Sequence, residues 1–146
     1  MKACFLVMLS LLVAPSTFAQ RPYTEKQVIE YAKSIDVHAL DTSLPSQRLE
    51  DWLQSGPPHA HISGWLMEGT CQLKPDDPKV DYPLCVKVSL GRDGAFGEFL
   101  VQVGTSRSGI VGSPKLYSGV GVYEPGYTKI RSSERLSDLP ALLTPR

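Results

Sequence analysis

Apolar residues recur at a helical spacing in the first part of the chain. One apolar stripe consists of Val28, Ile29, Ala32 and Ile35. Thr24 stands just before this stripe with Gln27 three positions later. This is the capping-box pattern, in which each side chain accepts a hydrogen bond from the other residue's free backbone N–H group. The pattern predicts a helix that starts after Thr24 and ends near Asp36.

A second, shorter helix is predicted after Pro45, because proline fits the first turn of a helix, where its missing N–H group costs nothing. Its buried face is expected to consist of Leu49, Trp52 and Leu53. Gly56 and the pair Pro57-Pro58 end it. We expect Trp52 to anchor this helix on a sheet.

From residue 60 onward the apolar spacing becomes alternating, which predicts strands. The expected strands cover residues 60–73, 84–90, 95–104 and 116–123, with a short further one at 127–130. Gly64 or Gly69 is expected to bulge the first strand. Asp93-Gly94 predicts a tight hairpin, since both central positions of a type I′ turn require a positive φ. A final short helix is expected to carry Leu136 and Leu139.

This order of elements predicts an α+β fold. We expect an antiparallel sheet of about four strands, with the two N-terminal helices and the short C-terminal helix packed on one face. The Gly/Ser-rich segment 104–115 is expected to be a connection between strands. The segment 74–83, rich in proline and aspartate, is expected to be a surface loop. No repeat or long linker divides residues 20–146, so we expect them to form a single exported domain.

Residues 1–19 have the pattern of a cleavable signal peptide. Lys2 supplies a positive start, an apolar run covers residues 3–14, and small residues stand at Thr17 and Ala19, where a signal peptidase requires them. The apolar run is shorter than the roughly 20 residues of a membrane-spanning helix. We therefore expect cleavage after Ala19, no membrane span afterwards, and a secreted or periplasmic location.

Cleavage would remove Cys4 and leave the mature chain with Cys71 and Cys85. An even pair of cysteines in an exported domain indicates a disulfide bond. The two are 14 positions apart, and closing a loop of that size is worth about 3 kcal/mol in the chain-entropy model. A metal site made of thiolates is the alternative, but the close C-x-x-C spacing is missing. We expect the bond to join two strands across the loop 74–83.

The balance of charge limits the classes of partner. The chain has 15 basic and 15 acidic residues, and loss of Lys2 leaves the mature chain slightly acidic. No basic run or stripe is present, so we expect no nucleic-acid partner. The hydrophobic content of 42% is typical of a folded globular domain.

Histidines are the main candidates for chemistry. His59 and His61 are two positions apart, so on a strand both imidazoles would point to the same side and could share a metal ion. A further ligand would have to come from His38, Glu68 or an aspartate. In the alternative interpretation His59 belongs to a turn and His61 to an exposed strand face. We favour this alternative and expect no metal or other cofactor.

Other polar segments match known sites incompletely. His38 lies between Asp36 and Asp41, and a neighbouring carboxylate can orient a histidine as a general base. However, no serine lies in a G-x-S-x-G elbow, which would supply a nucleophile. The segment 104–115 has two apolar residues where a phosphate-binding loop requires Lys and Ser or Thr. The acidic segment 76–81 lacks the spaced pattern of a calcium-binding loop.

Two functions are compatible with the sequence. The first is a non-enzymatic binding module that takes a protein or a small ligand on its sheet or loops. The second is a small exported metal-dependent or hydrolytic enzyme centred on His38, His59 and His61, which requires these side chains to converge in a pocket with a carboxylate. We favour the first, because no complete catalytic set is visible.

Overall fold

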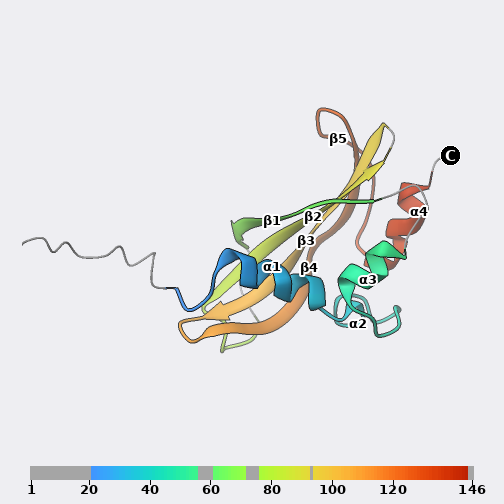
Figure 1. Cartoon of the computed structure of the whole chain (residues 1–146). Coiled ribbons are helices and arrows are strands. Elements are labelled where there is room, and N and C mark those ends of the chain that lie inside the picture. The colour runs from blue at the N-terminus through green and yellow to red at the C-terminus, as the bar shows by residue number, and fades with distance from the viewer. Residues whose placement is uncertain (1–20, 56–60, 72–75, 93, 145–146) are drawn as a thin grey trace, which may run out of the picture.

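The computed structural model describes residues 21–55, 61–71, 76–92 and 94–144. They form an antiparallel sheet in which each strand pairs with the next one along the chain. Short helices lie against one face of this sheet (Figure 1). The elements are α1 Glu25–Ser34, α2 Val37–Leu40, α3 Leu49–Gln54, β1 His61–Thr70, β2 Tyr82–Arg92, β3 Ala95–Ser106, β4 Gly109–Glu124, β5 Thr128–Ser133, η2 Leu136–Asp138 and α4 Leu139–Leu143.

The first helix, α1, forms where the capping box predicts it. The Thr24 N–H group donates to Gln27 Oε1 at 2.7 Å, and the Gln27 N–H group donates to Thr24 Oγ1 at 3.1 Å. Val28 and Ala32 are fully buried, so the predicted apolar stripe is the face that α1 turns to the core. The helix ends at Ser34.

The second predicted helix begins later than expected, at Leu49 rather than after Pro45. The Asp36 carboxylate accepts hydrogen bonds from Ser46 Oγ and from the Gln47 N–H group, and this holds the chain before α3 in an extended conformation. The four residues that directly follow Asp36, Val37–Leu40, form an additional helix, α2, and Asp36 is its N-cap. The expectation for Trp52 is wrong in part, because this side chain is only half-buried while Leu53 and Leu49 make the buried face.

The sheet has five strands among the described residues, not about four. The segment 104–115, expected to be a connection, belongs to the long hairpin of β3 and β4, whose turn is Arg107-Ser108. The glycines of this segment do not form a loop; they let other parts of the chain pack closely against the strands. A Cβ atom on Gly104 would lie 2.6 Å from Val80 Cγ2, and one on Gly112 would lie 2.7 Å from Tyr31 Oη. The α+β class, the antiparallel sheet and the bulges of β1 at both Gly64 and Gly69 are confirmed.

The hydrophobic core lies between the sheet and the helices. Alternate residues of β2 and β3 face it, with Leu84, Val86, Val88 and Leu90 from β2 and Phe99, Val101 and Val103 from β3. Each buried side chain of this size is worth about 1.5–3 kcal/mol of hydrophobic stabilisation. Gly97 continues this face of β3 beneath α4, since a Cβ atom there would lie 3.0 Å from Leu143 Cδ2.

The opposite face of the sheet carries the predicted disulfide bond. Cys71 and Cys85 are joined, with Cα atoms 5.0 Å apart, and both are buried. Just beyond them the segment 76–81 is held against the sheet: Ser113 Oγ donates to Asp77 at 2.6 Å, and Asp76 pairs with Lys115. The disulfide therefore fastens β1 to β2 beside a loop that covers one end of this face.

No helix in the described part of the chain is long and apolar enough to cross a membrane. The predicted signal peptide, residues 1–19, lies outside the described residues.

Candidate functional site

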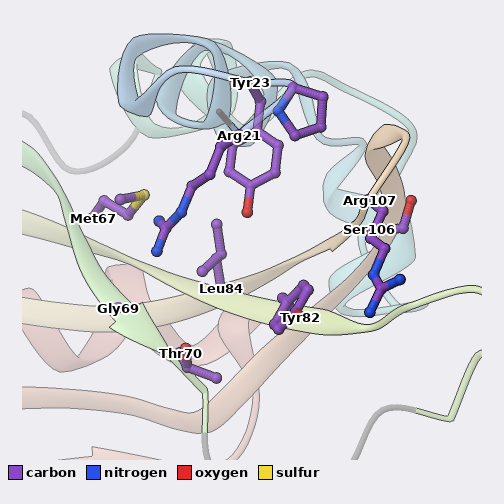
Figure 2. Close-up of a pocket in the computed structure, with 10 residues that line it drawn as sticks. Arg21, Tyr23, Met67, Gly69, Thr70, Tyr82, Leu84, Ser106 and Arg107 are labelled. Carbon is purple, nitrogen blue, oxygen red and sulfur yellow. The ribbon is translucent and has the colours of Figure 1, made fainter. Parts of the chain in front are cut away.

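A pocket of about 830 Å³ opens between the segment that leads into α1 and one end of the sheet (Figure 2). Its described walls are residues 21–23, the end of β1, the start of β2 and the turn between β3 and β4. Pockets of about 300–1,000 Å³ are the usual size for small organic ligands. The pocket is therefore large enough for such a ligand and lies where four separate parts of the chain meet.

The bulge at Gly69 shapes this pocket. Met67 pairs with Val86, and Thr70 pairs with Leu84, so both face the same side of the sheet although they are three positions apart. In a regular strand residues three apart point to opposite faces, and the extra residue of a bulge corrects this. Gly69 adopts a φ of +120°, and no atom lies within 4 Å of the position that a Cβ would take. The predicted bulge thus brings the Thr70 hydroxyl into the same wall as the Met67 side chain.

The floor of the pocket is apolar with hydroxyl groups at its sides. Leu84, below the ring of Tyr23, and Met67, beside Arg21, supply the apolar surface (Figure 2). Behind them the buried Thr105 hydroxyl donates to the Tyr82 carbonyl at 2.6 Å, and its Oγ1 lies 3.3 Å from Tyr23 Oη. These contacts fix both tyrosines to the end of β3.

Two guanidinium groups flank the pocket. Arg21 comes from the segment before α1 and Arg107 from the turn between β3 and β4, and they lie on either side of Tyr23 (Figure 2). Among the described residues neither has an acidic side chain within ion-pair distance. The described lining contains no carboxylate at all. Because arginine stays protonated at any physiological pH, this pocket has a positive rim.

The described lining also contains no histidine or cysteine. Thr70 and Ser106 therefore have no neighbouring base in the lining that would turn a hydroxyl into a nucleophile. Ser106 Oγ lies 2.8 Å from Ser108 Oγ, within the hairpin turn. The arrangement can donate hydrogen bonds and bury an apolar surface.

The described histidines do not lie in this pocket. His61 is exposed on the face of the sheet opposite the helices, where its ring lies against Gly91. His38 belongs to α2, and its Nδ1 lies 2.8 Å from the Leu44 carbonyl oxygen. His59 lies outside the described residues. The structure thus places His38 and His61 on opposite sides of the sheet, and no group of three potential metal ligands is found among the residues it describes.

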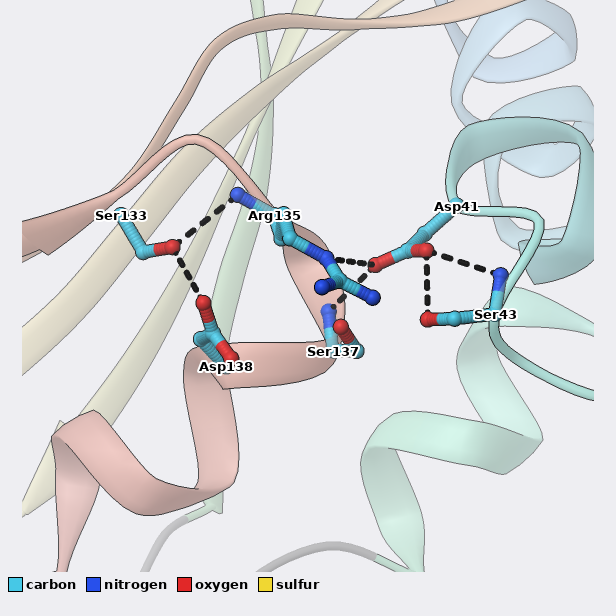
Figure 3. A network of polar contacts seen from close by, with 6 residues as sticks. All are labelled: Asp41, Ser43, Ser133, Arg135, Ser137 and Asp138. Atoms are coloured by element: carbon cyan, nitrogen blue, oxygen red, sulfur yellow. Dashed lines mark hydrogen bonds and ion pairs between the residues drawn. The ribbon is translucent and has the colours of Figure 1, made fainter.

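The carboxylates on either side of His38 hold the backbone. Asp36 accepts a hydrogen bond of 3.0 Å from the His38 backbone N–H group. A second hydrogen bond, from the Ser46 side chain, lowers the pKa of Asp36. Asp41 accepts hydrogen bonds from Ser43 in its own loop and from the Ser137 N–H group in the C-terminal turn (Figure 3). Both carboxylates have a structural use, and neither orients the imidazole.

The other face of the sheet carries an aromatic cluster of the half-buried Phe96 and Tyr123 and the exposed Tyr127. The ring centroids are 5.2–5.7 Å apart. Lys129 Nζ lies 5.9 Å from the centre of the Tyr123 ring, a cation–π contact. The acidic segment 76–81 lies at the far end of this face. Its Asp77 is engaged by Ser113, which lowers the pKa of Asp77.

Sequence reasoning identified the bulge at Gly69 but not the pocket, because its walls come from residues up to 86 positions apart, such as Arg21 and Arg107. The one local signal is the Gly/Ser-rich composition around the β3–β4 turn, and that composition is equally typical of a simple connection between strands. Comparisons with protein-family models, with curated proteins and with solved structures gave no match for this chain.

Proposed function

We propose that this protein is an exported, non-enzymatic binding module that holds a small ligand in the pocket between residues 21–23 and the sheet. One observation carries the proposal: an apolar floor, formed by Met67 and Leu84, is combined with hydroxyl groups and a positive rim in a single recess. An apolar recess with a few placed polar groups is the usual composition of a small-molecule site. Catalysis would need in addition an activating base, which the described lining lacks.

Export is supported by two independent features. Residues 1–19 have the order of charge, apolar run and small residues that signal peptidases recognise. The Cys71–Cys85 bond belongs to a type that persists in oxidising compartments. Cleavage after Ala19 would start the mature chain at Gln20, directly before the pocket residue Arg21. The intact mass of the protein purified from its native compartment tests this, and a mass that includes residues 1–19 would contradict export with cleavage.

The binding site can be tested with a matched pair of substitutions on β1. Met67 faces the pocket, whereas its neighbour Leu66 points to the opposite face and is 48% exposed. Met67→Trp fills the recess with a larger side chain, and Leu66→Trp adds the same group outside it. We expect Met67→Trp to abolish binding of small amphipathic compounds measured by calorimetry, and Leu66→Trp to leave their affinity unchanged.

Circular dichroism of both variants shows whether the fold is kept. If no compound in a panel of neutral, anionic and cationic amphiphiles binds the mature protein, the proposed function is wrong. It is also wrong if compounds bind but Met67→Trp and Leu66→Trp affect them equally, because the site would then lie elsewhere.

A further inference from the structure

We infer that the ligand of this pocket is an amphipathic carboxylate, with its anionic group at the positive rim that Arg21 and Arg107 form and its apolar part on Met67 and Leu84. This inference rests on the proposed function and adds the chemical class of the ligand. It follows from three properties of the walls, which are their charge, their apolar floor and their hydrogen-bond donors.

The charge of the walls is one-sided. Some basic side chains of the described structure are neutralised at short range, as Lys87 is by Glu68 at 2.7 Å and Lys33 is by Glu30 at 3.3 Å. Arg21 and Arg107 have no such partner among the described residues, and the described lining holds no carboxylate that would repel an anion. A guanidinium fork matches a carboxylate with two parallel N–H···O bonds. A negatively charged ligand is therefore favoured over a neutral or cationic one.

The apolar floor requires more than a simple anion. Met67 lies beside Arg21 and Leu84 lies below Tyr23, both away from Arg107 (Figure 2). An inorganic anion at the rim would leave this surface in contact with water. A chain or ring attached to the anionic group would cover it, and each buried methylene adds about 0.8 kcal/mol to a ligand's transfer free energy, close to fourfold in affinity.

Hydroxyl groups at the rim provide further donors. Thr70 and Tyr82 are exposed at the end of β1 and the start of β2, and both line the pocket. Each hydroxyl can donate one hydrogen bond to a carboxylate oxygen. The bulge at Gly69 is what turns Thr70 towards this position.

The inference is tested by measuring the affinity of the mature protein for decanoate, decanol, decyltrimethylammonium and acetate by calorimetry. The two single variants Arg21→Gln and Arg107→Gln are compared with Lys129→Gln, which removes the same charge on the opposite face of the sheet. We expect decanoate to bind at least about tenfold more tightly than decanol, as charge-assisted hydrogen bonds imply. Each arginine variant should lower the affinity for decanoate about three- to tenfold and leave the affinity for decanol unchanged. In about 1 M salt the Debye length is about 3 Å. There the affinity for decanoate should exceed the affinity for decanol much less than it does at low salt.

The outcomes separate the inference from the proposed function. Equal binding of decanoate and decanol, both abolished by Met67→Trp, would overturn the anionic ligand and keep the pocket as the site. Arginine variants that weaken decanol as much as decanoate would also overturn it, since the guanidinium groups would then act on the fold alone. If acetate bound as tightly as decanoate, the apolar floor would not contribute to binding, and the inference of an amphipathic ligand would be wrong. Failure of every probe to bind would overturn both proposals.

Discussion

The Ser137 backbone N–H group donates a hydrogen bond of 2.9 Å to the carboxylate of Asp41, which lies 96 positions earlier in the chain. The same carboxylate accepts the N–H and hydroxyl groups of Ser43 at 3.0 and 2.7 Å, and the Arg135 guanidinium lies 4.0 Å away (Figure 3). The Asp41 side chain is only 8% exposed. This carboxylate joins the loop after α2 to the turn before α4, so it closes the helical layer over the sheet.

Replacement of Asp41 by alanine should therefore lower the free energy of unfolding. The change leaves the Ser137 N–H group without an acceptor at a part-buried position, and we expect a loss of about 2–3 kcal/mol. Urea unfolding measures it. Glu124→Ala serves as the control, because Glu124 is exposed at the end of β4 and its loss should cost less than about 0.5 kcal/mol. Equal losses in the two variants would show that the Asp41 contacts contribute nothing specific.

The contribution of Asp41 should also depend on pH. The hydrogen bonds from Ser43 and Ser137 hold the pKa of Asp41 well below its ordinary value of 3.8. A carboxyl group whose pKa is lower in the folded state stabilises the fold fully above the unfolded pKa, and this stabilisation is lost as the pH falls towards the folded pKa. The wild type should therefore lose stability more steeply below about pH 4 than Asp41→Asn, which has no proton to take up. Urea unfolding at several pH values measures this. If the free energy of unfolding fell equally with pH in the two proteins below that pH, the pH dependence would not come from Asp41.

Local patterns were enough to predict much of the fold. The capping box of α1 depends on Thr24 and Gln27 alone, and the strand pattern of β2 depends on the alternation within it. The bulge at Gly69 follows from a glycine inside β1, because only glycine takes the φ of +120° found there without strain. Each of these signals is contained within a few residues of the element that it specifies.

Features that depend on distant contacts were not predicted. The start of α3 is delayed because Asp36 holds the chain near Gln47, and no pattern near Pro45 reveals that competition. The glycines of the segment 104–115 suggested a loop, although Gly104 fits beneath Val80 and Gly112 against Tyr31. The candidate site shows the same limit, since its bulge was visible in the sequence while the approach of Arg21 to the end of the sheet was not.

Loss of the disulfide bond should lower stability by about 3 kcal/mol, because the bond closes a loop of 14 positions in the unfolded chain. The double variant Cys71→Ala/Cys85→Ala tests this by urea unfolding. The variant should also become insensitive to a reducing agent, whereas the wild type should unfold at lower urea when reduced. A reduced wild type that unfolds at the same urea concentration as the oxidised protein would show that the bond contributes little to stability.

Gly97 and Gly64 offer a test of how closely α4 packs on the sheet. A Cβ atom on Gly97 would lie 3.0 Å from Leu143 Cδ2 and 3.5 Å from Leu139 Cδ1, so in Gly97→Ala the Leu143 side chain of α4 has to shift by a few tenths of an ångström. Overpacking of this kind costs about 1–3 kcal/mol. Gly64 also lies in a strand, but no atom lies within 4 Å of its Cβ position. Gly64→Ala should leave the urea midpoint unchanged or raise it slightly, because alanine restricts the unfolded chain. If Gly97→Ala proved as stable as Gly64→Ala, the helix would have room to move, and α4 would not be seated on the sheet through Gly97.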